Sequence, residues 1–295
     1  MSDGDSSRRG FLREIAAAAR EVRATGAAAR DATTPAEDTA PVRRAAALSE
    51  AEVERYSRQL VLPQWSEAAQ LALREASVLV VGAGALGSPV ALYLAGAGVG
   101  RLGVVDSDAV EVSNLHRQPL HFTPDVGVAK ALSAASKLAF LNPEVEVVPY
   151  HVRFEAGNAE GLLHGHDLVV DCSDSFATRH AVNAACCAAG VPLVEGGVVG
   201  LAGVVMAIRP GEGACYRCAF PEPPPPGAEA TCAQAGVLGP AAGVIGSLQA
   251  LEALKLLTGF APPLLGAFLQ VDLLELSFLR VAVDRRDDCL DCGGR

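Results

Sequence analysis

The sequence has few aromatic residues, no excess of basic charge and no long apolar run. Nine Phe, four Tyr and one Trp among 295 residues leave little material for a surface that stacks nucleic-acid bases. Twenty-four basic residues against 34 acidic ones give a net charge of −10, which argues against nucleic-acid binding through bulk charge. No apolar stretch reaches the roughly 18 residues that a membrane span needs. We therefore expect neither a membrane protein nor a nucleic-acid-binding protein.

The cysteine content is also low for a protein held together by disulfides. Eight cysteines in a chain of this length do not resemble a small secreted scaffold, and 50% hydrophobic residues supply a core without them. A reducing compartment, the cytoplasm, is the expected location. Ser7–Leu12 does match a twin-arginine export signal. Charged residues between Glu14 and Arg23 interrupt the apolar stretch that such a signal requires, so export is not expected.

The first 48 residues differ in composition from the rest of the chain. They are rich in Ala and Arg and poor in large apolar residues, which predicts a flexible N-terminal extension over residues 1–48. Ser49 and Glu52 form a capping-box pattern that predicts a helix through about Leu60. One folded domain is expected over residues 49–295.

Short apolar runs alternate with helical stretches from Ser77 onwards. This alternation predicts an α/β fold, a Rossmann-like doubly wound sheet that is mostly parallel. After Gly196 a single long helix interrupts the strands, which predicts an antiparallel C-terminal extension of the same sheet. The expected strands cover 77–81, 102–106, 145–149, 168–172, 192–195, 204–208 and 266–274, and the expected helices cover 89–97, 130–141, 179–189 and 244–257.

A glycine-rich motif, G-x-G-x-x-G over residues 82–87, lies between an expected strand and an expected helix. In this context the glycines permit a tight turn and close approach of the backbone to phosphate oxygens, while the helix N-terminus adds partial positive charge. Asp106 ends the next strand, where a carboxylate can accept hydrogen bonds from ribose hydroxyls. The pattern predicts that the chain binds an adenine nucleotide.

The choice between NAD and ATP depends on residues further along the chain. Arg117, Lys130 and Asp174 stand where a doubly wound sheet can bring them together at the carboxyl ends of its strands. Two cations and a carboxylate suit a triphosphate with Mg²⁺ better than a dinucleotide. Each residue also has an ordinary alternative, because the two cations can be solvated surface charges and Asp174 can cap a helix.

Two C-x-x-C pairs, Cys215 with Cys218 and Cys289 with Cys292, lie in the last third of the chain. Each pair offers two thiolates from one tight turn, and four thiolates form a closed tetrahedral site of the structural Zn²⁺ type. Redox-active pairs or free thiols are the alternatives. The cysteines at positions 172, 186 and 187 fall in expected strands or helices and are predicted to be core residues.

Several motifs occur together in one unbroken order. They are Arg55-Tyr56-Ser57-Arg58-Gln59, the glycine loop, Asp106-x-Asp108, Ser113-Asn114-Leu115-His116-Arg117-Gln118, Lys130 and Asp171-Cys172-Ser173-Asp174. This combination resembles the ThiF/MoeB/HesA family, prokaryotic relatives of ubiquitin-activating enzymes, with MoeB as the nearest branch. The resemblance runs from about Leu48 to Gly294.

The resemblance implies an activity and a set of roles. The enzyme would use ATP to adenylate the C-terminal glycine of a small ubiquitin-like sulfur carrier of the MoaD/ThiS type, giving an acyl-adenylate and pyrophosphate. Among the implied nucleotide-binding residues, Asp106 would hold the ribose, Asn114, Arg117 and Lys130 would contact the phosphates, and Asp174 would bind Mg²⁺. The other implied nucleotide-binding residues are Gly82, Gly84, Ala85, Gly87, Ser113 and Ser175. The implied catalytic residues are Arg58, Arg117, Lys130 and Asp174, with Arg58 reaching into the partner subunit of a homodimer. The resemblance also supports zinc at the four cysteines, remote from the chemistry.

Three positions depart from the family pattern, and a fourth, Cys232, fits it. Ala85 stands where the family usually has a glycine, and Ser175 stands where it usually has Asn. Glu195 replaces a residue that is usually small, and it is expected to alter the surface near the carrier tail. Cys232 lies in a Pro- and Gly-rich loop where a cysteine in relatives links to the carrier or handles sulfur, with a spectator thiol as the alternative.

Other functions stay open at this point. A tRNA-modifying dehydratase of the same superfamily also activates a carboxylate with ATP, although the net charge and the four paired cysteines weigh against it. A nucleotide-binding scaffold without turnover is opposed by Arg117, Lys130 and Asp174. An NAD-dependent oxidoreductase would need a hydride-transfer site, and none is recognisable. The carrier can belong to the molybdopterin, thiamine or another pathway, and a separate sulfur donor protein is a further possible partner.

Overall fold

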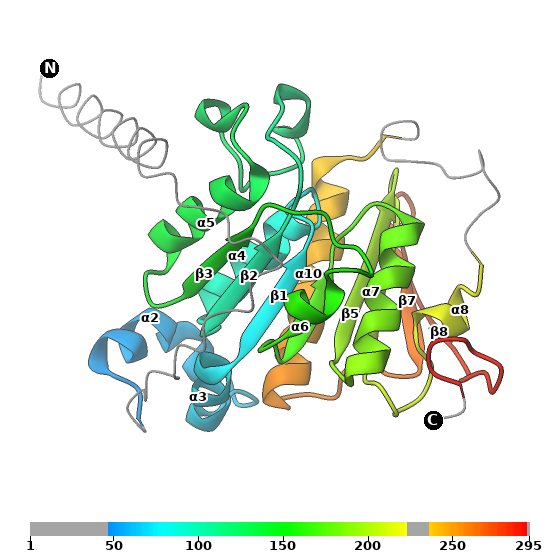
Figure 1. The fold of residues 1–295 in the computed structure, drawn as a ribbon. Coiled ribbons are helices and arrows are strands. Elements are labelled where there is room, and N and C mark those ends of the chain that lie inside the picture. Colours follow the sequence, from blue (N-terminus) through cyan, green and yellow to red (C-terminus); the bar gives the residue numbers. More distant parts are fainter. Residues whose placement is uncertain (1–46, 223–235, 294–295) are drawn as a thin grey trace, which may run out of the picture.

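The computed structural model describes residues 47–222 and 236–293. These residues form an eight-stranded sheet with strand order β3-β2-β1-β4-β5-β6-β7-β8, and helices cover both of its faces (Figure 1). The predictions for residues 1–46, which make up nearly all of the expected flexible extension, lie outside the described residues.

The first five strands are parallel, as predicted. They are β1 (Ser77–Val81), β2 (Arg101–Val105), β3 (Glu146–Tyr150), β4 (Leu168–Asp171) and β5 (Leu193–Val199). Every residue of β1 and β4 is buried, which explains why these strands are continuous apolar runs rather than alternating ones. The strand order reverses at β1, so β2 and β4 leave it on opposite sides and open a crevice at its carboxyl end.

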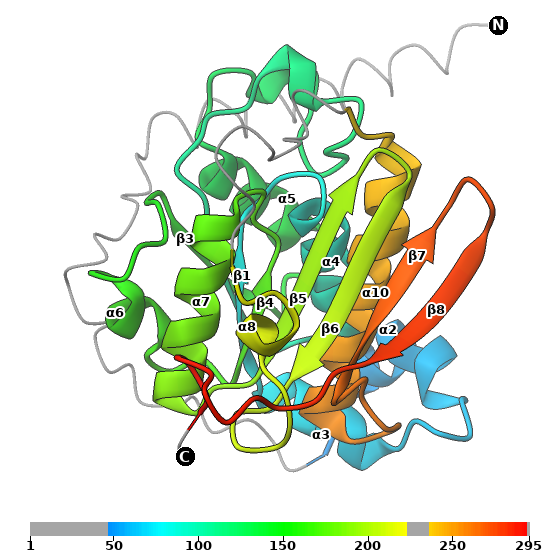
Figure 2. The ribbon, with the colours of Figure 1, turned by 90° about the vertical axis from the view of Figure 1, so that its right-hand side faces the viewer.

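The remaining strands extend the sheet in antiparallel fashion, also as predicted. They are β6 (Ala202–Ile208), β7 (Ala267–Asp272) and β8 (Ser277–Ala282), which Figure 2 shows continuing beyond β5. The prediction of one strand over 266–274 was incomplete, because the chain turns back near Leu276, which has φ of 53°, and forms β8. Most of β8 is exposed at the sheet edge, so it carries little of the apolar pattern that marks a buried strand.

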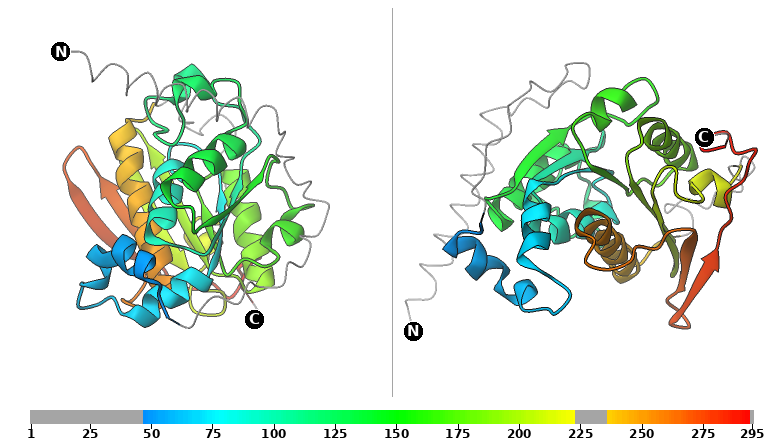
Figure 3. Two further views of the ribbon diagram at one scale, coloured as in Figure 1. Left: turned by 90° about the vertical axis from the view of Figure 1, so that its left-hand side faces the viewer. Right: turned by 90° about the horizontal axis from the view of Figure 1, so that it is seen from below.

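Two layers of helices enclose the sheet. On one face, α3 (Glu67–Glu75), α4 (Gly87–Ala97), α5 (Lys130–Leu141) and α10 (Gly239–Thr258) share a core with it. On the other face, α6 (Ala159–Leu163), α7 (Phe176–Ala189) and α8 (Tyr216–Ala219) share a second core (Figure 3). The fold is therefore a three-layer, doubly wound one.

Helix α10 is long and apolar enough to cross a membrane by length and composition. Within this fold it packs against β5, β6, α3 and α4. Gly246 lets it approach α4 closely, since a Cβ there would lie 2.5 Å from Pro89. These contacts are those of a core helix of the α/β domain.

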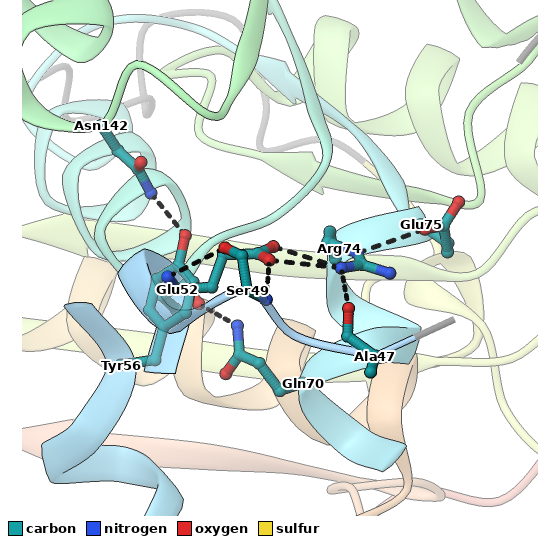
Figure 4. A network of polar contacts seen from close by, with 9 residues as sticks. Ala47, Ser49, Glu52, Tyr56, Gln70, Arg74, Glu75 and Asn142 are labelled. Atoms are coloured by element: carbon teal, nitrogen blue, oxygen red, sulfur yellow. Dashed lines mark hydrogen bonds and ion pairs between the residues drawn. The ribbon is translucent and has the colours of Figure 1, made fainter. Parts of the chain in front are cut away.

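The helix α2 (Glu50–Leu60) is tied to the domain by a polar network. Its predicted capping box is present, with Glu52 N–H donating to Ser49 Oγ and Ser49 N–H donating to the Glu52 carboxylate. Glu52 also pairs with Arg74 of α3 at 3.3 Å, and the Tyr56 hydroxyl accepts a hydrogen bond from Asn142 at 2.9 Å (Figure 4). The helix is thereby fixed against α3 and the end of α5.

Candidate active site

A cleft of about 490 Å³ opens at the carboxyl ends of β1, β2 and β4, at the reversal of strand order. This is where open α/β sheets bind their ligands. Most of the residues predicted from sequence line it, namely Gly82, Gly84, Ala85, Asp106, Asn114, Arg117, Lys130 and Asp174. Four predicted residues, Arg58, Gly87, Ser113 and Ser175, do not line it.

Two glycines give the loop after β1 its shape. Gly82 has φ of 95°, and a Cβ there would lie 2.9 Å from the carbonyl oxygen of Cys172 on the neighbouring strand. A Cβ on Gly87 would overlap the carbonyl oxygen of Gly82. Gly87 therefore closes the loop onto α4 and does not face the cleft, whereas Gly84 and Ala85 do.

Asp106 is held at the end of β2 by two backbone donors. Its Oδ2 accepts a hydrogen bond from Ala83 N–H at 2.8 Å, and its Oδ1 accepts one from Asp108 N–H at 2.8 Å. Each carboxylate oxygen keeps a second lone pair, which can accept a hydroxyl. Burial raises the pKa of Asp106, and the nearby Lys130 cation opposes that rise.

Lys130 begins α5 and is buried beside the cleft. Its Nζ lies 2.8 Å from Asp108 Oδ2, and this hydrogen bond is the main reason that the pKa of Asp108 is lowered. The sequence motif contains Asp108, but its role as the partner of the lysine becomes clear only in the structure. The pair holds a largely desolvated cation in a fixed position at the cleft.

The 3₁₀ helix η1 (Val112–Asn114) contributes Asn114 to the lining of the cleft, and Arg117 follows shortly after it. Arg117 Nη1 donates a hydrogen bond to the carbonyl oxygen of Ser113 at 2.7 Å, which anchors the guanidinium. Asn114 is buried, and its side-chain oxygen accepts from Glu111 N–H at 3.2 Å. The Ser113 hydroxyl donates a hydrogen bond to the Glu111 carboxylate, and Ser113 does not line the cleft. Ser113 therefore acts on the site through its carbonyl oxygen, which anchors Arg117.

Asp174 stands exposed at the rim of the cleft. Within the described part of the chain its carboxylate has no hydrogen bond or ion pair, so it is available to a cation. The alternative role of helix cap falls to Ser175, whose hydroxyl accepts a hydrogen bond from Thr178 N–H at 3.1 Å. This cap explains why α7 begins at Phe176, earlier than predicted.

Three residues that the sequence reasoning missed also line the cleft. Arg153 and Phe154 follow β3, and Arg179 lies on α7. The rule that drew attention to Asp106 and Asp174, that polar residues after parallel strands face the ligand, applies equally to Arg153. No sequence signal of this kind marks Arg179, because it lies within α7 and reaches the cleft only through the way this helix packs on the sheet.

Glu195 contradicts the expectation that it alters the surface. Its exposed fraction is 2%, and the register of β4 with β5 places it directly beside Asp171, which is also buried. Arg179 Nε lies 3.3 Å from Glu195 Oε1, and Arg179 Nη2 donates to the carbonyl oxygen of Ser173. Burial and the charge of Asp171 raise the pKa of Glu195 well above its ordinary value. One guanidinium thus faces two buried carboxyl groups, and this arrangement favours the protonated form of one of them.

The buried acid predicts a pH-dependent stability. The pKa of Glu195 is higher in the folded protein than in the unfolded chain, where it lies near 4.5. The free energy of unfolding therefore falls as pH rises above about 4.5, by at most about 1.4 kcal/mol per pH unit, until the folded protein also releases the proton. Glu195→Gln removes this titrating group while it keeps nearly the same side-chain shape. Urea unfolding between about pH 6 and pH 8 should show a steeper loss of stability in the unmodified protein than in the variant. Parallel pH profiles would contradict the assignment.

The four paired cysteines converge, as predicted. Their Sγ atoms all lie within 4.8 Å of one another, with 3.6 Å between Cys215 and Cys289 and 3.4 Å between Cys218 and Cys292. All four are buried, and Arg286 N–H points to Cys218 Sγ at 3.5 Å. Four thiolates so placed suit a metal ion with tetrahedral coordination, such as Zn²⁺. The first pair follows β6, which is antiparallel to β5, so the chain leaves β6 at the amino ends of the parallel strands, away from the cleft at their carboxyl ends. Cys232 lies outside the described residues.

Removing one thiol of the cluster should release the metal. Cys289→Ser leaves three thiolate ligands, so we expect zinc content after gel filtration with a chelator to fall from about one ion per chain to a small fraction. Thermal stability should fall with it. Cys186→Ala is the matched control, because Cys186 is equally buried but outside the cluster. Zinc loss in the control alone, or in neither variant, would rule out the four-cysteine site.

Comparison with known proteins shows the family of this chain. The model of the ThiF family matches residues 56–291. The chain belongs to the ThiF family. A sulfur carrier protein adenylyltransferase of Thermus thermophilus is 52% identical over 247 residues, which cover 82% of this chain and 91% of that protein. The ThiF/MoeB resemblance read from the motifs is therefore confirmed.

A second relative is longer than this chain. The adenylyltransferase and sulfurtransferase MOCS3 of Sus scrofa is 50% identical over 256 residues, which cover 86% of this chain but 56% of that protein. The chain thus spans little more than half of this relative.

Solved structures confirm the predicted fold. The crystal structure of E. coli MccB with MccA-N7isoASN superposes with a TM-score of 0.74 at 25% identity, covering 81% of this chain and 75% of that one. PaaA superposes with a TM-score of 0.70 at 21% identity and covers 97% of this chain and 88% of that one.

Proposed function

We propose that the chain is a nucleotidyltransferase that uses ATP to adenylate the C-terminal glycine carboxylate of a small ubiquitin-like sulfur carrier ending in Gly-Gly, releasing pyrophosphate. The observation that carries this proposal is the convergence of Asp106, Arg117, Lys130 and Asp174 in one cleft of a ThiF-family chain. The names of the relatives at 52% and 50% identity support the same reaction.

The nucleotide would lie across the carboxyl ends of β1 and β2. Asp106 would accept hydrogen bonds from the ribose hydroxyls, because each of its oxygens keeps a free lone pair. Asn114, Arg117 and Lys130 would contact the phosphates. Lys130 suits this role because it is buried and held by Asp108, so its charge acts through a medium that screens it less than water does.

The chemistry needs alignment and charge neutralisation rather than a protein nucleophile. The carrier carboxylate is already ionised at neutral pH, so no general base has to activate it for attack on the α-phosphorus. The obstacle is the repulsion between a carboxylate and a polyphosphate, and Arg117 and Lys130 offset it as negative charge develops on the departing pyrophosphate. Asp174 would hold the Mg²⁺ that accompanies ATP, and this ion neutralises further phosphate charge. The carrier tail would enter past Val198 and Val199, which line the cleft at the end of β5.

The assembly and the metal site complete the proposal. Arg58 lies exposed on the last turn of α2 and outside its own cleft, in keeping with a role in the partner's site of a homodimer. The four cysteines would hold a structural Zn²⁺. Sulfur would come from a separate donor protein or pass through Cys232, and the enzyme would work in the cytoplasm.

The experiment is ATP–pyrophosphate exchange with each small Gly-Gly-ending carrier supplied singly. Exchange should depend on one carrier, and Asp174→Asn should reduce it by about 100-fold or more because the variant loses a ligand of Mg²⁺. Asp284→Asn is the matched control, since Asp284 is also exposed but does not line the cleft. Normal exchange by Asp174→Asn would refute the metal-binding role. ATP binding without exchange with any carrier would favour the tRNA-modifying branch or a non-catalytic scaffold.

A further inference from the structure

A buried histidine stands behind the glycine loop and outside the cleft. His121 has an exposed fraction of 3% and does not line the cleft. Its Nε2 lies 2.8 Å from the carbonyl oxygen of Ala83 in the glycine loop, and its Nδ1 lies 2.9 Å from Ser133 Oγ on α5. The ring therefore joins the loop to the helix that begins with Lys130.

The neighbours of His121 define its tautomer. A carbonyl oxygen can only accept, so Nε2 carries the hydrogen. Ser133 Oγ accepts a hydrogen bond from Lys137 Nζ, which leaves the serine hydrogen for His121 Nδ1. Both ring nitrogens are thus occupied in the neutral form, and burial lowers the pKa of His121 accordingly.

The backbone of Ala83 is held by a hydrogen bond at each of its two polar groups. Its N–H donates to Asp106 Oδ2, and its carbonyl accepts from His121. Peptide planes are trans throughout the described residues, so the Gly84 N–H points away from the carbonyl that His121 holds. Gly84 lines the cleft, and among the described residues its N–H has no hydrogen-bond partner. A donor so placed can bind an anion in the cleft.

We propose that His121 is a positioning residue, which holds the Ala83 carbonyl so that the Gly84 N–H faces the phosphates of ATP. The inference rests on the proposed function, because it takes the ligand to be a nucleoside triphosphate. Through Ser133 the same ring keeps the loop in register with α5, so that Lys130 and the loop amide act on one ligand.

Two amide variants separate the two hydrogen bonds that the His121 ring makes. In His121→Gln the amide nitrogen takes the place of Nε2 and can still donate to Ala83, whereas in His121→Asn it takes the place of Nδ1 and cannot. We expect the Gln variant to keep the Kd for ATP within about threefold and the Asn variant to weaken binding about tenfold, the effect of losing one hydrogen bond. The KM for the carrier should stay unchanged in both.

Calorimetry of ATP binding with Mg²⁺ is the primary measurement, and urea unfolding checks that both variants fold. Equal Kd values for the Gln and Asn variants would overturn the proposal. Should the Asn variant not fold, a folded Gln variant that binds ATP tenfold more weakly would also overturn it. Ser133→Ala, which frees Nδ1, should weaken ATP binding about threefold, and an unchanged Kd would contradict the role of the ring. Because these assays need no carrier, their failure is distinct from a failure of the proposed reaction.

Discussion

The reversal of strand order at β1 is the constraint on which the rest of the structure depends. Because β2 and β4 leave β1 on opposite sides, the loops after these strands diverge and open a cleft between them. The loop after β1 must then turn sharply into α4, and Gly82 and Gly87 allow this where a side chain would collide with the backbone. Asp106 and Asp174 reach the cleft for the same reason, since each follows a strand next to β1.

Several cationic side chains line the cleft, and three of them are held by a carboxylate or a carbonyl oxygen. Lys130 is paired with Asp108, and Arg117 is anchored on a carbonyl oxygen, so both cations are held in place before any ligand arrives. Arg179, deeper in the fold, is paired with Glu195 beside a second buried carboxyl group. Such preorganisation lowers the cost of ordering groups around a polyphosphate. The acidic rim residue Asp174 is left available to a metal ion.

Much of this architecture could be predicted from the sequence, because local signals agreed with one another. The buried strands, the glycine motif and the C-x-x-C pairs carry strong periodicity or spacing, and most of the predicted nucleotide-binding residues line one cleft. The failures concern features that depend on packing. The burial of Glu195 depends on its register with Asp171, and the place of Arg179 depends on the docking of α7. The strand β8 was missed because an exposed edge strand has no buried face to reveal it.

The proposed reaction leaves a defined product on the carrier, and this product can be identified directly. The chain would be mixed with ATP, Mg²⁺ and a Gly-Gly-ending carrier, and the mass of the intact carrier would be measured by mass spectrometry. We predict a carrier that has gained one adenylyl group at its C-terminal glycine, with pyrophosphate released in equal amount, and no gain on a carrier that lacks this glycine. Release of ADP and phosphate without an adduct, or an adduct that does not need the terminal glycine, would contradict the proposed adenylation.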